Sequence, residues 1–313
     1  MRVQESALFA GVVEAALSIT YARSNIGLKL AGARALVKRI LIGIGGTPFT
    51  AVAIRRAAEL AALHRAQVTA VTVVDEARLR QVGPVPLGGG AAAGALRQHR
   101  IAVTREKIDA AIVSLEKQCA AESVPLTVLR EHGDPCSLLR QHARYHDLMV
   151  FGLRSMFEYD VFAGDDVDPA TVLNGLAKAG VSPILAVSEK YRRIRRALVA
   201  YDGSMQAAHA MRQFVRLRLW PDVAIRILTS NGQDKESQQL LDDARAYCLS
   251  HGVDTTAVYC PGAARDEILK EASSCDADLI VLGFSGRTRI ASTLFGSTAL
   301  HVLRNTDRPF FLS

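Results

Sequence analysis

The sequence predicts an α/β protein built of two tandem, doubly wound, five-stranded parallel-sheet domains. Continuous apolar runs that end in turn residues are typical of strands buried on both faces of a parallel sheet. Stretches with apolar residues at helical spacing separate these runs, as right-handed crossover connections require. The runs also recur in the same order in both halves of the chain, which indicates a duplicated domain rather than a short-period repeat.

The duplication is visible in three pairs of segments. The first run ends in Gly45-Gly46-Thr47, and its counterpart ends in Asp202-Gly203-Ser204. The matched segments, in the first and then the second half, are 39–44 with 196–201, 147–152 with 278–283, and 182–185 with 308–311. We therefore expect a first domain at 39–190 and a second at 194–313.

Two segments fall outside the duplicated unit. Residues 1–38 resemble neither half, and we treat them as an N-terminal extension that is either an additional helix or the product of an early start codon. Residues 82–94, rich in Gly, Pro and Ala, are inserted in the first half and predict a mobile loop.

In the second half the pattern of elements is regular. We expect strands near 196–201, 223–229, 254–260, 278–283 and 309–312, and helices over 205–217 and 236–249. In a doubly wound sheet, ligands bind outside the carboxyl ends of the strands, where the winding direction reverses. This rule directs attention to Asp202 and to the loop that follows Gly283.

Composition and charge exclude several classes of function. Of the 313 residues, 49% are apolar and 22% are charged, the usual mix of a globular protein. The net charge of +7 is spread widely, and the densest run of arginines, within 192–196, has no interleaved aromatic residue. We therefore expect a solvated linker there and no nucleic-acid partner. The five cysteines form no CxxC pair, which argues against a zinc ribbon or disulfide framework and favours a reducing cytoplasm.

Membrane and metal sites are not indicated either. The most apolar early stretch, 7–20, contains Glu14 and is shorter than the about 20 residues that a spanning helix needs, so we expect no membrane partner. The acidic run 158–168 does not follow the alternate-position pattern of a calcium loop. The histidines form no HExxH motif, and we expect no metal ligands among them.

The loop after 278–283 carries the strongest functional pattern. Its glycines recur as Gly283, two residues, Gly286, nine residues and Gly296, and Ser297 follows at once. Gly283 lacks a side chain and would let backbone N–H groups approach an anion, while Gly286 would permit the reversal that wraps the loop around it. Gly296 opens a helical pattern whose free N–H groups suit phosphate oxygens.

Side chains of the same loop add donors. The hydroxyls of Ser297 and Thr298 would hydrogen-bond a phosphate, and Arg287 or Arg289 would supply positive charge. Simpler interpretations stay open: the glycines as turn residues, Ser297 as a plain helix N-cap, and the arginines as solvated side chains.

This arrangement resembles the nucleotide loop of the universal stress protein family, in its ATP-binding branch. The Gly-x2-Gly-x9-Gly-Ser signature is met, and Asp202-Gly203-Ser204 matches the end of the family's first strand. The resemblance covers about residues 39–313, as two tandem copies, and implies an adenine nucleotide alpha hydrolase-like, Rossmann-like fold. One departure is Phe284-Ser285, which stands where the family usually has a basic residue or His.

The resemblance also implies a ligand and roles for residues. ATP would be the cofactor, with Asp202 on a ribose hydroxyl, a backbone group of Leu228 on adenine, and any Mg²⁺ bound through the phosphates. The duller interpretation of Asp202 is an acceptor that caps the helix beginning at Ser204. Whether ATP or AMP is the physiological ligand stays open.

The first copy departs from the same signature. Gly45 occupies the position of Asp202, and after Gly152 no second glycine follows at the expected spacing. The acidic residues of 158–168 would repel phosphates. We therefore expect the first copy to bind no ATP and to serve as a structural or regulatory partner of the second.

Other signatures of nucleotide enzymes and hydrolases are missing. No Gly-x4-Gly-Lys-Ser/Thr motif occurs, so the P-loop lysine is lacking. Ser285 lies in a sequence close to a nucleophile elbow, but no His and acid partner can be identified for it. No general base is evident near the loop, so we expect at most weak ATP hydrolysis.

Three functions remain open. The first, which the resemblance implies, is a stress-response or regulatory protein in which ATP in the second half alters the surface offered to a protein partner. The second is a slow ATP hydrolase or phosphotransfer enzyme on the same scaffold. The third is an interaction module without a ligand.

The fifth strands of the two copies bear on assembly. Residues 183–187 and 309–312 are apolar and would form sheet edges that need covering. The resemblance implies pairing at this edge, either within one chain as a pseudo-dimer of the two copies or between two chains as a homodimer.

Overall fold

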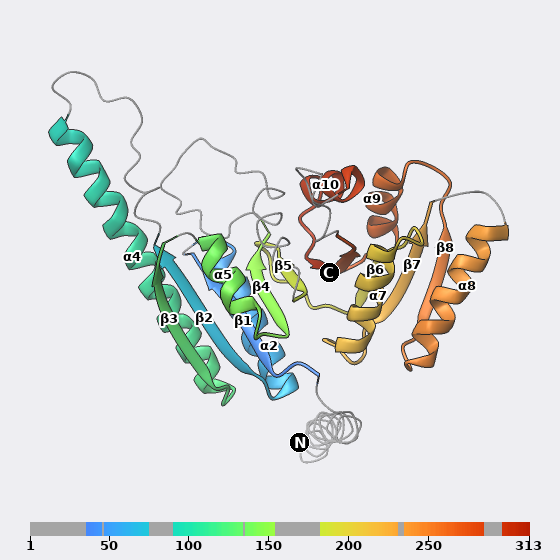
Figure 1. The fold of residues 1–313 in the computed structure, drawn as a ribbon, viewed down its shortest axis with the longest axis horizontal. Coiled ribbons are helices and arrows are strands. Elements are labelled where there is room, and N and C mark those ends of the chain that lie inside the picture. Colours follow the sequence, from blue (N-terminus) through green and yellow to red (C-terminus); the bar gives the residue numbers. More distant parts are fainter. Residues whose placement is uncertain are drawn as a thin grey trace, which may run out of the picture. The chain divides into compact units, whose positions relative to one another are not determined.

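The computed structural model describes residues 36–45, 47–74, 90–133, 135–153, 182–230, 235–284 and 296–313. Over these ranges the chain forms a ten-stranded sheet and seven helices (Figure 1). The strands lie in the order β3-β2-β1-β4-β5-β10-β9-β6-β7-β8. All of these elements belong to the compact unit Val37–Ser313.

The first half contributes five strands that run parallel to one another. Its elements are β1 (Arg39–Ile44), α2 (Thr50–His64), β2 (Gln67–Val74), α4 (Gly90–Ala121), β3 (Leu126–His132), α5 (Pro135–Ala143), β4 (Leu148–Gly152) and β5 (Ile184–Val187). Helix α2 packs against α4 on one face, and α5 contacts β1 and β2.

The second half repeats this arrangement with five further parallel strands. Its elements are β6 (Arg196–Ala200), α7 (Met205–Leu217), β7 (Ala224–Thr229), α8 (Lys235–Ser250), β8 (Thr255–Tyr259), α9 (Ala264–Ser274), β9 (Leu279–Leu282), α10 (Ser297–Arg304) and β10 (Phe310–Leu312). The predicted strands and helices of this half are confirmed to within one residue at each end.

Burial explains why the apolar runs became strands. Every residue of β4 and of β9 is buried, as expected for central strands covered on both faces. The carboxylate of Asp147, just before β4, accepts hydrogen bonds of 2.7 and 2.9 Å from consecutive backbone N–H groups at the start of β1. Asp278 does the same, at 2.9 and 3.0 Å, at the start of β6. The duplication is therefore preserved down to single hydrogen-bonded side chains.

The two halves join through their fifth strands. Strands β5 and β10 pair antiparallel, with Phe311 opposite Leu185, and both strands are fully buried. The prediction that these strands pair within one chain is confirmed. Association of two chains as a homodimer stays a prediction.

Helix α4 corrects one expectation. Residues 82–94 were predicted to form a loop, but α4 begins at Gly90, so the prediction is wrong for 90–94, while 82–89 lie outside the described residues. The second part of the helix is anchored by buried Thr104, Ile108, Ile112 and Leu115, at helical spacing. The first turns extend past the end of β3 (Figure 1), and most of their residues are exposed although Ala93 is buried.

Two other predicted features lie outside the described residues: the extension up to residue 35 and the acidic run 158–168. Among the helices in the described ranges, none combines the length and hydropathy that crossing a membrane demands.

Candidate functional site

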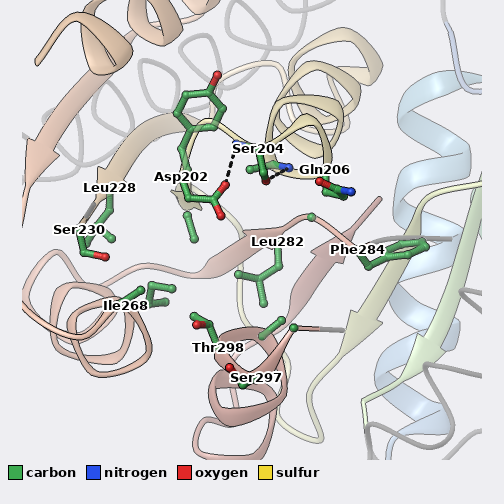
Figure 2. Close-up of a pocket in the computed structure, with 17 residues that line it drawn as sticks. Asp202, Ser204, Gln206, Leu228, Ser230, Ile268, Leu282, Phe284, Ser297 and Thr298 are labelled. Carbon is green, nitrogen blue, oxygen red and sulfur yellow. Dashed lines mark hydrogen bonds between the residues drawn. The ribbon is translucent and has the colours of Figure 1, made fainter. Parts of the chain in front are cut away.

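The candidate site lies where the winding of the second half reverses. The chain leaves β6 toward β7 and returns on the other side of β6 as β9, so a crevice opens at the carboxyl ends of these strands. A pocket of about 400 Å³ occupies the crevice (Figure 2). This volume is in the range of small-molecule sites.

Six of the eight predicted site residues line this one pocket. They are Asp202, Leu228, Gly283, Gly296, Ser297 and Thr298. The other two, Gly286 and Arg287, lie outside the described residues, as does Arg289. The fold thus brings to a single crevice segments that are far apart in the sequence.

Asp202 is held by a tight turn that follows β6. The backbone N–H of Ser204 donates to Oδ1 of Asp202 at 2.9 Å, and Gly203 supports the turn with φ of +79°, a conformation that favours glycine. Ser204 is the N-cap of α7, because its Oγ accepts the N–H of Ala207 at 3.2 Å. Ser204 therefore holds the N-cap position that the structural interpretation gave to Asp202, while Asp202 does accept the N–H of Ser204 as that interpretation expected. The Asp202 carboxylate orders the preceding turn and lies on the wall of the pocket.

Gly283 has a packing role that its position in the loop did not reveal. A Cβ added there would lie 2.6 Å from the backbone nitrogen of Ala207 and would also overlap the backbone of Gln206. The end of β9 therefore rests directly on the first turn of α7. We expected Gly283 to serve the approach of an anion; the contact seen is between strand and helix.

Gly296 has a different environment. It is the N-cap of α10, with extended φ and ψ of −61° and 160°, and no described atom lies within 4 Å of a Cβ placed on it. Glycine has no side chain to cap the helix, and the first residues of α10, Ser297 and Thr298, line the pocket (Figure 2). An anion here would meet the positive end of the helix dipole.

Leu228 lies at the end of β7, on the wall of the pocket. Its carbonyl oxygen already accepts the N–H of Tyr201 at 2.8 Å. A carbonyl has two lone pairs, so one acceptor position remains for a ligand.

Several pocket residues carry no motif that sequence analysis could use. They are Tyr201, Gln206, Ser230, Ala264 and Ile268. Ala264 and Ile268 belong to the first turns of α9, which begin after the carboxyl end of β8. The switch-point rule was the signal that could have found them, since it applies to every helix that starts at this edge of the sheet.

Tyr201 lines the pocket beside an acidic side chain, Asp202. Burial, followed by the negative charge of Asp202, raises the pKa of Tyr201 above its usual value. Tyr201 therefore stays a neutral phenol at physiological pH and can both donate and accept a hydrogen bond. The described residues contain no group of three or more His, Cys, Asp or Glu side chains arranged to hold a metal ion.

The equivalent place in the first half is built differently. Gly45, which is buried, stands at the position of Asp202. A Cβ added to Gly43 would overlap the ring of Phe151, with Cδ1 at 2.6 Å, and Phe151 is 1% exposed. The corresponding residues of the second half, Ala200 and Leu282, line the pocket. In the first half an aromatic ring therefore packs on the glycine of the first strand, whereas the corresponding alanine and leucine of the second half line the pocket.

Comparisons with known proteins agree with this duplicated architecture. The sequence model of the Universal stress protein family matches residues 37–156 and 193–312. A relative, Universal stress protein Slr1230 from Synechocystis sp., is 23% identical over 288 residues, which are 87% of this chain and 98% of the relative.

Solved structures show the same fold. A universal stress protein from Archaeoglobus fulgidus matches with a TM-score of 0.60 at 18% identity, over 88% of this chain and 95% of that one. A putative universal stress protein from Pseudomonas aeruginosa matches with a TM-score of 0.59 at 15% identity, over 90% and 94%.

Proposed function

The chain belongs to the universal stress protein family, and on that premise we propose that the pocket of its second half binds an adenine nucleotide, ATP, and that the chain is a regulatory protein that responds to this nucleotide. The observation that carries the proposal is the meeting of a carboxylate and an open helix N-terminus in one crevice. Asp202 lies on one wall and the start of α10 on another. A ribose needs acceptors for its hydroxyls, and phosphates need donors, so one nucleotide satisfies both walls.

Each part of the nucleotide has a counterpart in the pocket. Asp202 accepts a ribose hydroxyl, and the remaining lone pair of the Leu228 carbonyl accepts the adenine amino group. The N–H groups at the start of α10 bind phosphate oxygens, with the Ser297 and Thr298 hydroxyls beside them. The side chain of Ile268 supplies an apolar wall for the base. Any Mg²⁺ ion is held through the phosphates.

The first test is direct. Protein purified from cells and then denatured should release an adenine nucleotide that mass spectrometry identifies, and calorimetry should show one nucleotide bound per chain. Two nucleotides per chain would contradict the assignment of the site to the second half. Release of AMP alone would correct the identity of the ligand, and absence of any binding would overturn the proposal.

A variant tests the phosphate contact. Gly296→Val places a branched side chain where no described atom interferes, so the fold should persist while the phosphates are displaced, and ATP affinity should fall by at least about 100-fold. Gly90→Val is the matched control, because no described atom lies within 4 Å of a Cβ at Gly90 either and that residue belongs to α4. Equal affinity in the two variants would show that the start of α10 is not the phosphate site.

Hydrolysis is separable from binding. Incubation with Mg-ATP and measurement of ADP distinguishes a binding protein from a slow hydrolase or phosphotransfer enzyme. We expect ATP to be bound and returned unchanged over many binding cycles, because Asp202, the one acidic side chain among the described residues of the pocket, is assigned to the ribose and not to a water.

A further inference from the structure

Helix α7 starts at the nucleotide pocket and ends at a contact between the two halves. Its first turn supplies Gln206 and Ala207 to the pocket wall. Its 13 residues, at about 1.5 Å each, place its last turn about 20 Å away. Leu219 and Trp220, just beyond that turn, touch the first half. The helix therefore runs from the pocket to a segment that contacts the first half.

At the pocket end the contact on α7 is made by backbone. The place of a Cβ on Gly283 lies 2.6 Å from the Ala207 nitrogen, so no side chain separates the end of β9 from the helix. Side chains adjust by rotating, but two backbones in contact shift together. The same turn of α7 lines the pocket through Gln206 and Ala207, so a nucleotide bound there lies against the part of the helix that supports the end of β9.

At the far end two residues of α2 hold the segment after α7. The buried His64 donates from Nε2 to the carbonyl oxygen of Leu219 at 3.1 Å. The guanidinium of Arg56, which is 3% exposed, lies 5.5 Å from the centre of the Trp220 ring. A buried cation beside an aromatic face is sensitive to small changes in geometry.

A second path leads from α7 to the strand that joins the halves. The ring of Phe214 meets Phe311 edge-on at 5.2 Å and lies 6.4 Å from Trp220. Phe311 belongs to β10 and stands opposite Leu185 of β5. A shift of α7 therefore reaches the pairing of β5 with β10 through Phe214 on its buried face. It also reaches the contact between Arg56 and Trp220, which lies just beyond its last turn.

We propose that α7 couples nucleotide occupancy of the second half to the contact with the first half at Arg56, His64 and Trp220. The proposal rests on the proposed nucleotide site and adds its regulation. The first half then acts as the built-in regulatory partner of the second. By linkage, a change at the contact must alter nucleotide affinity by the same factor as the nucleotide alters the contact.

The chain carries its own reporter of this coupling. Trp220 is the single tryptophan of the sequence and is not among the residues that line the pocket. ATP is titrated into the full chain, with heat followed by calorimetry and tryptophan emission excited at the red edge, where adenine does not absorb. We expect emission to change and to saturate with the same Kd as the heat.

Paired variants test the reciprocal effect. Arg56→Met removes the cation at the Trp220 ring and should change the Kd for ATP by at least about fivefold. Arg55→Met is the matched control: Arg55 and Arg56 both pair with Glu59 and both lie over the Tyr191 ring, at 3.6 and 4.7 Å from its centre, but the side chain of Arg55 is exposed to solvent. This variant should bind ATP like the unmodified chain.

The outcomes separate the two proposals. Absence of binding heat in the unmodified chain overturns the nucleotide site and the coupling with it. Heat without a change in Trp220 emission overturns the coupling and leaves the site standing, and this measurement needs no variant to fold. Equal Kd values in the Arg56→Met and Arg55→Met proteins also overturn the coupling.

Discussion

The two halves share a sheet and differ at the carboxyl ends of the strands. Asp147 and Asp278 tie the start of the first strand to the fourth strand in the same way in each half. In contrast, Gly45 stands where the second half has Asp202, and the Phe151 ring packs on Gly43. The interactions that fix the fold are therefore retained in both copies, while the positions that shape a crevice have changed in one.

The largest effect is expected at Gly283, which lines the pocket and also packs against the backbone of α7. Gly283→Ala forces a methyl group to within 2.6 Å of the Ala207 nitrogen, and overpacking against backbone should destabilise the second half by about 3 kcal/mol. Urea denaturation measures the loss. Gly296→Ala places its methyl group in open space, so this variant should have the same free energy of unfolding as the unmodified chain. A similar loss of stability in the Gly283→Ala and Gly296→Ala proteins would refute the distinction between the two glycines.

The next largest effect comes from replacing two residues of the first half by their counterparts in the second half. Gly43→Ala alone should cost about 2 kcal/mol, because its methyl group overlaps the Phe151 ring. Combining Gly43→Ala with Phe151→Leu reproduces the pair Ala200 and Leu282 and should recover at least half of that loss. A double-mutant cycle in urea measures the coupling, and strictly additive effects would show that the two positions do not share the space.

A smaller effect separates the two uses of the Asp202 carboxylate. Asp202→Asn keeps an acceptor for the Ser204 N–H, so the turn and the stability should be unchanged. The loss of charge should weaken ATP binding about tenfold, since charged hydrogen bonds are stronger than neutral ones by about 1.4 kcal/mol. Calorimetry tests this, and unchanged affinity would indicate that the carboxylate serves the turn alone.

The smallest effect is a loss of stability at acidic pH, and it comes from two buried histidines of the first half. Burial lowers the pKa of His64 and of His146 below the usual 6.5. The unfolded chain therefore takes up protons near pH 6.5 that the folded chain resists, and stability falls as the pH drops below that value. The urea midpoint should be lower at about pH 5.5 than at about pH 7.5. His146→Gln should reduce this difference, and a midpoint independent of pH would contradict the assignment.

Sequence patterns predicted what depends on local periodicity. The apolar run 196–201 and the helical spacing from Met205 to Leu217 predicted elements that the structure reproduces. Gly90 and Gly94 led to the wrong prediction of a loop, because helix α4 is stabilised by buried residues far downstream, such as Ile108 and Leu115. Local glycine content carries no information about such tertiary support.

Site residues could be predicted where a binding role has a recognisable sequence pattern. They could not be predicted where the role depends on contacts between distant parts of the chain. Asp202 and Gly296 could be named because acceptors and helix starts have recognisable patterns. The packing of Gly283 on Gln206 and Ala207 joins residues far apart in the chain, and the pocket wall formed by Ile268 uses an ordinary core side chain. Such features follow from topology and appear when the strands are placed side by side.

The antiparallel pairing of β5 with β10 within one chain has a further consequence. When identical subunits form a symmetric pair, every substitution appears twice and the assembly separates on dilution. A covalent link removes both constraints, since the local concentration of one half around the other no longer depends on how much protein is present. Each crevice was thereby free to diverge, and the two halves remain together at any cellular abundance.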